Sequence, residues 1–477
     1  MLWARRSEVH FHQTRPASAI SFEMDTYFTH VIKHELNADK RIYIPNKTVA
    51  LSYSVKKIRY AQHVTEKKGS FLMQDRAYFS MHLIRRDISV FNRYFVQFIW
   101  VLLLITLKVE ASDTLAVGAA QLDKYLPMLK DKQVGLVVNQ SAQVNGAHLV
   151  DTLLAHEVRV IRIFSPEHGF RGDQDAGAHI DNSVDAKTGL PIVSLYGAQK
   201  HPSKETLEDL DVILFDIQDV GVRFYTYIST MHNMMQAAKE NGIAFIVLDR
   251  PNPNIRFVAG PVLDNEFRSF VGMHPIPILH GMTVGELALM IEGEGWLLGK
   301  QRLDLKVISV TNYDASIEYS LPIAPSPNLP NQRAIHLYPS LCLFEATAVS
   351  VGRGTDFPFQ TFGHHKVKLG DFEFSPRSII GAARYPKLEG MQVWGKDLRH
   401  SAVRGFDLTW FVSTYEQFEL NNERFILHPD FLDKLAGTDI LRLAVEQGLK
   451  VHQMEAIWEK ELKTFKEKRM PYLLYNR

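Results

Sequence analysis

The 477-residue chain has few of the features that mark common cofactor and metal sites. Cys342 is its only cysteine, so it can form no intrachain disulfide, and cysteine pairing gives no information about the redox compartment. It has neither a GxGxxG loop nor a GxxxxGK[ST] loop, which argues against a Rossmann-type nucleotide site. The HExxH and GxSxG motifs are also missing, as is any cysteine pair that could bind zinc. We therefore expect no cofactor and no metal ion.

The chain also lacks an excess of charge of either sign. It has 54 Lys and Arg against 53 Asp and Glu, a formal net charge of +1, which gives no reason to expect nucleic acid or an acidic membrane as a partner. Its apolar content of 46% is that of an ordinary globular protein that buries a core.

Residues 81–112 have the pattern of a secretory signal peptide. Arg85, Arg86 and Arg93 precede an apolar core at 95–107, and the small residues that end at Ser112 would follow the core at a cleavage site. The core is shorter than the roughly 20 residues of a spanning helix, although a tilted anchor or a buried helix would be alternatives. We expect an exported protein, periplasmic or extracellular, with no stable membrane insertion once the signal is cleaved.

Eighty residues precede this signal, although a signal peptide belongs at the start of a chain. Residues 1–80 show little sustained periodicity, and Met81 would be a natural start. We interpret 1–80 as a non-native N-terminal extension, with a genuine extension of unknown role as the alternative.

From residue 113 onward, apolar runs alternate with helical patterns. This alternation is typical of parallel strands joined by right-handed helical crossovers. It predicts an α/β fold with a Rossmann-like, mostly parallel sheet over 113–330. The expected strands are 133–139, 158–164, 190–197, 212–218, 243–248 and 275–279, and the expected helices are 146–157, 203–210, 226–242 and 283–294.

A proline-rich stretch, PIAPSPNLPNQ at 322–332, cannot form regular structure and indicates a domain boundary. Residues 331–477 mix short strand and helix patterns, which predicts a smaller α+β auxiliary domain.

Polar clusters follow four of the apolar runs, at 165–172, 216–227, 249–253 and 280–283. In open parallel sheets the ligand crevice lies beyond the carboxyl ends of the strands. The polar side chains there should therefore converge on one crevice, and they comprise Glu167, Asp216, Asp219, Asp249 and His280.

The segment SPEHGFRG (165–172) is the most informative of these clusters. A partly shielded carboxyl group at Glu167 could have a raised pKa and act as a general acid, with His168 beside it. A loop carboxylate paired with Arg171 is an equally weighted alternative.

The run at 211–227 places Asp216 and Asp219 at a strand end, followed by Arg223 and Tyr225. Carboxylates beside an arginine suit sugar hydroxyls or a charged substrate, although an internal ion pair explains them equally well. Asp249 in DRPNP fits a structural turn better than a catalytic role.

The segment HGMTVGE has two interpretations. Thr283 and Glu286 form a T-x-x-E capping box, which accounts for Glu286 by helix capping alone. His280 is then the better functional candidate, and Glu286 stays a weaker candidate for a second carboxylate. Further along the chain, Arg353 in GRGTD could bind an anionic group bidentately.

These segments, together with PSPNLP (325–330) and YPSLCLFEATAVSVGRGTDFPFQTFG (338–363), resemble the NamZ family of exo-acting β-N-acetylmuramidases, formerly a domain of unknown function. The resemblance runs in order from about 133 to 477. It departs from the family pattern at Asn331-Gln332 and in ATAVSVGRGTD, and neither change removes a candidate acid.

The resemblance implies a cleft between two domains and release of N-acetylmuramic acid from non-reducing ends of peptidoglycan fragments. It places the glutamate of the family's SPEHG motif at Glu167, which we expect to be the general acid. Glycosidases usually need a second carboxyl group, for which Glu286, Asp216 and Asp219 stay open, and the separation of the two groups would distinguish inversion from retention. Assistance by the N-acetyl group of the substrate is the alternative to a second carboxyl group. Arg223 or Arg353 could bind the lactyl carboxylate of muramic acid, and Asn328 and Asp356 in the matching motifs complete the expected substrate-binding set.

The competing interpretation is a non-catalytic periplasmic protein that binds sugars or peptidoglycan fragments, because a fold does not determine a function. The convergent acids favour an enzyme, since a binder of neutral sugars would rely more on aromatic stacking and amides.

Overall fold

The computed structural model describes residues 114–167, 169–170, 183–195, 197 and 200–477. The expectations for 1–80 and for the signal segment 81–112 lie outside these residues, as do His168 and Arg171. No helix within the described ranges is long and apolar enough to cross a membrane.

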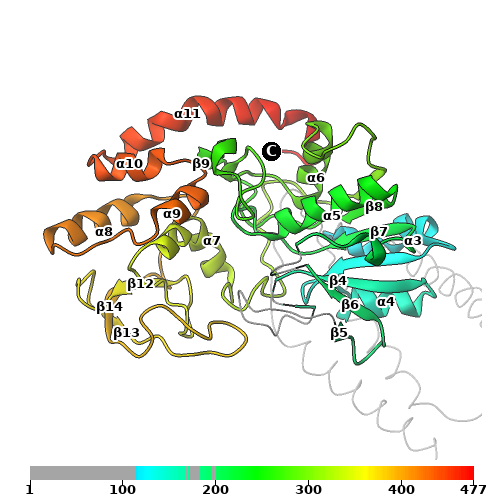
Figure 1. The fold of residues 1–477 in the computed structure, drawn as a ribbon, viewed down its shortest axis with the longest axis horizontal. Coiled ribbons are helices and arrows are strands. Elements are labelled where there is room, and N and C mark those ends of the chain that lie inside the picture. Colours follow the sequence, from blue (N-terminus) through cyan, green and yellow to red (C-terminus); the bar gives the residue numbers. More distant parts are fainter. Residues whose placement is uncertain (1–113, 168, 171–182, 196, 198–199) are drawn as a thin grey trace, which may run out of the picture. The chain divides into compact units, whose positions relative to one another are not determined.

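A seven-stranded sheet forms the first part of the described chain, in the order β11-β8-β7-β1-β4-β6-β5 (Figure 1). Its neighbouring strands are parallel except for β5, which runs antiparallel to β6 at the edge. The predicted mostly parallel sheet is confirmed. The strands are β1 (Val134–Val138), β4 (Val160–Ser165), β5 (Ser183–Val184), β6 (Pro191–Ser194), β7 (Val212–Asp216), β8 (Ala244–Leu248) and β11 (Leu305–Ile308).

Alternate residues of the central strands enter two different cores, because successive side chains of a strand point to opposite faces. In β7, Ile213 and Phe215 belong to one core, whereas Val212 and Leu214 belong to the other. Helices α5 (Tyr227–Asn241) and α6 (Val284–Gly293) contribute to the first core, and α3 (Leu122–Leu129) and α4 (Leu149–Ala155) to the second. Helices therefore cover both faces, so the central strands are apolar throughout.

The run at 275–279 was predicted to join this sheet, and that prediction is wrong. Its strand β10 (Pro277–Leu279) pairs antiparallel with β9 (Ala259–Val262) in a separate two-stranded sheet. Pro277 has no N–H to donate to a ladder, which confines such a strand to edges. A single bridge from Leu279 to Val222 holds this small sheet beside the segment that follows β7.

Three of the four predicted helices form with adjusted boundaries, and the helix predicted at 203–210 does not form. Helix α5 ends at Gly242 in the left-handed conformation, and α6 begins at the predicted Thr283–Glu286 capping box. The 203–210 segment forms only a short 3-10 turn, η3 (Lys204–Thr206), and α4 begins after the two-residue strand β3 (Ala147–His148).

The proline-rich stretch forms no helix or strand before α7 begins at Gln332. The residues that follow build several helices and an antiparallel sheet in the order β12-β14-β13. The last long helix, α11, returns to pack against β9 (Figure 1). These elements are α7 (Gln332–Leu341), η5 (Cys342–Ala346), β12 (Thr361–His364), β13 (Phe372–Phe374), β14 (Val393–Asp397), α8 (Thr409–Leu420), α9 (Pro429–Ala436), α10 (Ile440–Glu446), α11 (Val451–Lys468) and η6 (Met470–Tyr472).

Candidate active site

A cavity of about 380 Å³ is lined by residues from both the sheet domain and the segment after residue 330. Its volume falls within the roughly 300–1,000 Å³ that is usual for small-molecule sites. Four of the sequence-predicted site residues line it, namely Glu167, Tyr225, Asn328 and Arg353.

Glu167 reaches this cavity because it lies two residues beyond the carboxyl end of β4. Its side chain is partly buried, and its Oε2 accepts a hydrogen bond from Oγ1 of Thr226 at 3.3 Å. Thr226 immediately precedes α5, so the end of one strand and the start of one helix together hold the carboxyl group at the cavity wall.

A second carboxylate in the cavity was missed by the sequence reasoning. Glu345 lies in η5, and its Oε1 accepts a hydrogen bond from Nε of Arg353 at 2.7 Å. Burial alone would raise the pKa of Glu345, but the nearby cations Arg353 and Lys387 outweigh it and lower that pKa. Glu345 is therefore a carboxylate anion. The run YPSLCLFEATAVS is otherwise uncharged, and this lone acid in an apolar stretch was the signal that could have identified it.

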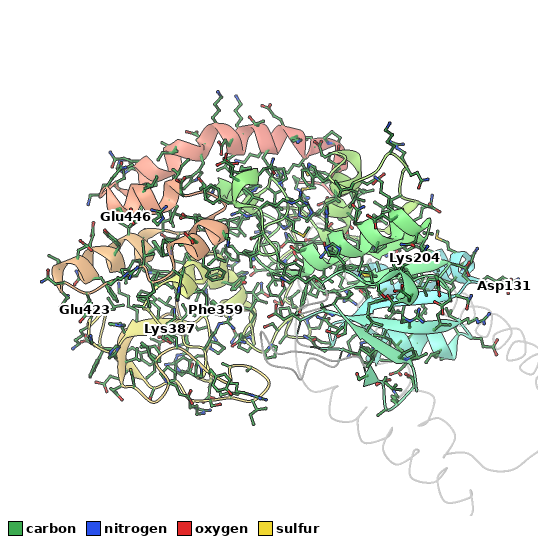
Figure 2. The ribbon with its side chains drawn as sticks, viewed as in Figure 1. Asp131, Lys204, Phe359, Lys387, Glu423 and Glu446 are labelled. Carbon is green, nitrogen blue, oxygen red and sulfur yellow. The ribbon has the colours of Figure 1, made fainter. Side chains whose placement is uncertain are left out.

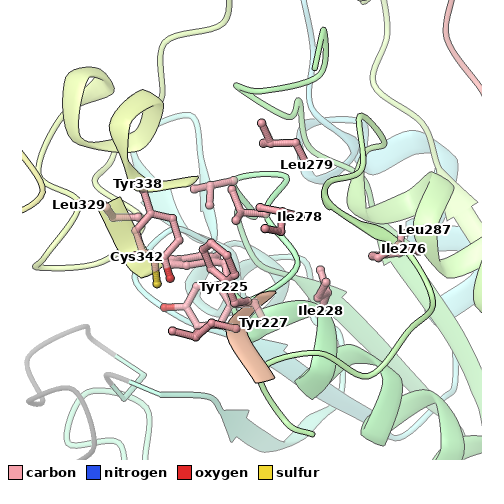
Figure 3. Close-up of a cluster of buried hydrophobic side chains, with 14 of the residues drawn as sticks. Tyr225, Tyr227, Ile228, Ile276, Ile278, Leu279, Leu287, Leu329, Tyr338 and Cys342 are labelled. Atoms are coloured by element: carbon pink, nitrogen blue, oxygen red, sulfur yellow. The ribbon is translucent and has the colours of Figure 1, made fainter. Parts of the chain in front are cut away.

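Aromatic side chains form much of the remaining wall. Three of them, Tyr225, Tyr227 and Tyr338, belong to the buried cluster drawn in Figure 3. Tyr225 and Tyr338 pack edge to face, with ring centroids 5.9 Å apart. Burial raises the pKa of both hydroxyl groups well above the usual value, so they stay neutral. Cys342 lies in the same wall, and burial raises the pKa of its thiol to about 12, which makes a nucleophilic thiolate unfavourable.

Asp216 does not line the cavity. It is fully buried at the end of β7, and its Oδ2 accepts from Nη2 of Arg250 at 2.9 Å. This is the internal ion pair that the sequence left as an alternative.

Asp249 and Glu286 also lie elsewhere, where they fix the C-terminus of the chain. Asp249 accepts hydrogen bonds from Oγ1 of Thr283 at 2.7 Å and from the hydroxyl of Tyr475 at 2.5 Å. Glu286 completes the capping box of α6 and forms an ion pair with Arg477 at 2.5 Å. Both carboxylates therefore have structural partners, and neither lines the cavity.

Asp219 and His280 form a buried pair outside the cavity lining. Oδ2 of Asp219 accepts from the N–H of Gly221 at 2.6 Å and lies 4.0 Å from Nε2 of His280. Burial raises the pKa of Asp219 to about 7, and burial, followed by nearby arginines, lowers the pKa of His280 to about 3. Both groups are therefore held towards their neutral forms.

Arg223 is fully buried, and its side chain does not line the cavity. Its terminal nitrogens donate to four backbone carbonyls. Nη1 donates to Pro261 in β9 and to Ile276 just before β10, and Nη2 donates to Leu435 and Ala436 at the end of α9. Asp356 is exposed and pairs with Arg377 at 2.7 Å. Neither residue is placed to bind a ligand in the cavity.

Within the described ranges, no group of three or more His, Cys, Asp or Glu side chains could hold a metal ion. The chemistry that this cavity offers is that of two carboxyl groups, a guanidinium and neutral phenols.

Residues 134–333 match the N-terminal part, and residues 336–475 the C-terminal part, of the family described as exo-beta-N-acetylmuramidase NamZ. The chain is 37% identical over 378 residues to the peptidoglycan beta-N-acetylmuramidase NamZ of Bacillus subtilis strain 168, covering 74% of this chain and 89% of that relative. It is also similar to crystal structures of two DUF1343 family proteins from Bacteroides fragilis, one 42% identical with a TM-score of 0.70 and one 29% identical with a TM-score of 0.65. Each similarity covers 76% of this chain and 99% of the other. The resemblance predicted from the motifs is thus confirmed, and the chain belongs to the NamZ family of exo-β-N-acetylmuramidases.

Proposed function

We propose that the protein is an exo-acting glycoside hydrolase that releases N-acetylmuramic acid from the non-reducing ends of peptidoglycan fragments. The observation that carries this proposal is one cavity that holds two carboxyl groups, Glu167 and Glu345, together with the guanidinium of Arg353. Hydrolysis of a glycosidic bond commonly uses such a pair of carboxyl groups, one protonated and one ionised. The Bacillus subtilis relative, named a peptidoglycan beta-N-acetylmuramidase, supports the same substrate.

Glu167 is assigned as the general acid that protonates the leaving glycosidic oxygen. It lies at the end of a parallel strand, where such folds position catalytic groups, and its partner Thr226 orients the carboxyl group. Glu345 is assigned as the second carboxyl group, the role for which the sequence offered Glu286, Asp216 and Asp219. Its ion pair with Arg353 keeps it negative, which suits stabilisation of positive charge at the anomeric carbon in the transition state.

Arg353 is assigned to the lactyl carboxylate, the group that distinguishes muramic acid from glucosamine. Its Nε bonds Glu345, and within the described residues no hydrogen bond uses its terminal nitrogens. A guanidinium can bind two carboxylates through different N–H groups, because its five donors form a rigid fork.

Export is part of this proposal, because peptidoglycan lies outside the cytoplasmic membrane. The signal-like segment 81–112 is the support for it, and a periplasmic or extracellular location is expected.

Hydrolysis of p-nitrophenyl β-N-acetylmuramide tests the function. We expect the purified protein to release nitrophenol from this substrate and not from the matching glucosaminide. With a muramic acid–glucosamine disaccharide, whose sugar leaves poorly as an alkoxide and therefore needs a proton, Glu167→Gln should lose at least about 100-fold in kcat, the order expected for a general acid. Glu446→Gln, on the exposed face of α10 (Figure 2), is the matched control and should keep full activity. Inertness of the unmodified protein towards both nitrophenyl substrates and the disaccharide would reject the hydrolase, and full activity of Glu167→Gln on the disaccharide would reject the assigned acid.

A further inference from the structure

A second hollow of about 740 Å³ adjoins the active-site cavity. Lys200 and Phe270 line both spaces, so the two share a wall. The hollow, which we term the basic annex, is formed by residues of α5, by Lys200 and His201, and by the loop that includes Arg268 and Phe270. The roles assigned to the active-site cavity do not account for it.

The charge of the basic annex has one sign. Its charged lining residues are Lys200 and Arg268, beside the histidines His201 and His232, and among the described residues no aspartate or glutamate lines it. Within that part of the chain, no carboxylate forms an ion pair with Lys200 or Arg268. The ammonium of Lys200 instead lies 4.4 Å from the centroid of the Phe270 ring. Unpaired cations around a hollow favour an anionic ligand.

A buried amide at the floor of the annex points to a ligand independently of this charge. Asn233 is 2% exposed and donates from Nδ2 to the carbonyl oxygen of Lys200 at 3.0 Å. Its Oδ1 is buried without a hydrogen-bond partner. Because an unpaired buried acceptor is costly, Oδ1 of Asn233 is suited to accept from a ligand N–H such as that of an acetamido group.

We propose that the basic annex binds the leaving part of the glycan and that its cations take a carboxylate of the next muramic acid along the chain. This inference rests on the proposed function. If Arg353 holds the lactyl group of the terminal sugar and Glu167 protonates the bond to be cleaved, the leaving sugars extend away from Arg353. Lys200 and Phe270 then lie on their path, where the Phe270 ring offers an apolar face to a sugar ring.

The carboxylate has two possible sources with the same chemistry, the lactyl group of the downstream muramic acid and a stem peptide attached to it. Three oligosaccharides distinguish these sources. The first is a peptide-free muramic acid–glucosamine tetrasaccharide, and the second is the same tetrasaccharide with its downstream lactyl carboxylate converted to an amide. In the third, the downstream lactyl group is linked through an amide bond to an L-alanyl-D-glutamate peptide, which supplies the only carboxylates at that sugar. Aryl muramide serves as the substrate that cannot reach the annex.

The test compares the unmodified protein with Arg268→Gln, since Arg268 is exposed and lines only the annex. Lys204→Gln is the matched control, because Lys204 is an exposed cation on η3 outside the annex (Figure 2). We expect the lactyl tetrasaccharide to exceed its amide by about tenfold in kcat/KM, the worth of one charge-assisted hydrogen bond. Arg268→Gln should bring the ratio of the two kcat/KM values to about one, and Lys204→Gln should leave the ratio at about ten. A ratio that appears only with the peptide-bearing substrate would assign the carboxylate to the stem peptide and support the annex.

If the protein hydrolyses aryl muramide but has equal kcat/KM values for all three oligosaccharides, and Arg268→Gln does not change these values, the inference is overturned. If aryl muramide is not hydrolysed, the proposed function fails by itself, and calorimetric Kd values for the same three oligosaccharides then decide the annex. Tighter binding of a carboxylate-bearing oligosaccharide that depends on Arg268 supports the annex, and equal Kd values reject it.

Discussion

The guanidinium of Arg353 lies against two neighbours at once in the active-site cavity. Its Nε donates to Oε1 of Glu345 at 2.7 Å, and its central carbon lies 4.8 Å from the centroid of the Phe359 ring. The ion pair and the aromatic face fix the plane of the guanidinium. A carboxylate that enters the cavity therefore meets an oriented donor whose position has already been set by the protein.

Replacement of Arg353 by lysine should reduce the selectivity for muramic acid. Lysine keeps the charge but cannot bond Glu345 and a lactyl carboxylate through separate edges of one rigid group. We expect the ratio of kcat/KM for aryl muramide to that for aryl glucosaminide to fall by about tenfold or more. Arg377→Lys, at an exposed ion pair outside the cavity, is the matched control. An unchanged ratio in Arg353→Lys would remove Arg353 from lactyl recognition.

Replacement of Glu345 by glutamine should lower kcat far more than it raises KM. The change keeps the size of the side chain and removes the negative charge that we expect to act on the transition state. A loss of about 100-fold or more in kcat is expected for a second catalytic carboxylate. Single-turnover kinetics with aryl muramide measures it, and circular dichroism checks the fold. A rise in KM alone would show that Glu345 only positions Arg353.

The sheet was predictable because its central strands are buried on both faces and therefore apolar throughout, as in VILFD at β7. Glu167 was predictable for a related reason, since a polar cluster directly follows such a strand. The convergence predicted for Asp216, Asp249 and His280 failed, because strand ends are also where charges pair internally, as Asp216 does with Arg250. Sequence spacing does not distinguish a carboxylate that faces a ligand from one that faces an arginine.

Glu345 could not be found from strand ends, because it lies in η5 and reaches the cavity only through packing between segments distant in the chain. The structural role of Arg223 was hidden for the same reason. Two of its four carbonyl partners come from Leu435 and Ala436, more than 200 residues away.

Replacement of Arg223 by methionine should destabilise the fold without a direct effect on chemistry. The substitution would leave four buried carbonyl groups without their donor, at a cost of about 3 kcal/mol or more in the free energy of unfolding. Chemical denaturation measures this loss. Gly437 offers a second test, since a Cβ there would lie 2.6 Å from Nη2 of Arg223, so Gly437→Ala should also destabilise. Stability equal to that of the unmodified protein in both variants would contradict the structural role.

The buried carboxyl group of Asp219 should make stability depend on pH. Burial raises its pKa from 3.8 to about 7. In the unfolded chain this group loses its proton as the pH rises above about 4, whereas in the folded protein it keeps the proton until about pH 7. Between these pH values the unfolded state binds fewer protons than the folded state. The contribution of Asp219 to the free energy of unfolding therefore falls as the pH rises from about 4 to about 7, and this contribution is constant at higher pH.

Asp219→Asn should remove this contribution, because asparagine has no proton to lose in this range and its Oδ1 can still accept from the N–H of Gly221. The difference in free energy of unfolding between Asp219→Asn and the unmodified protein should grow in favour of the variant from pH 4 to pH 7. Its slope should be at most about 1.4 kcal/mol per pH unit. Asp249, whose pKa burial raises to about 6, titrates in both proteins and cancels in this difference. Denaturant titrations at pH 4, 5.5, 7 and 8 measure it, and a difference that does not change with pH would show that Asp219 is ionised in the folded protein.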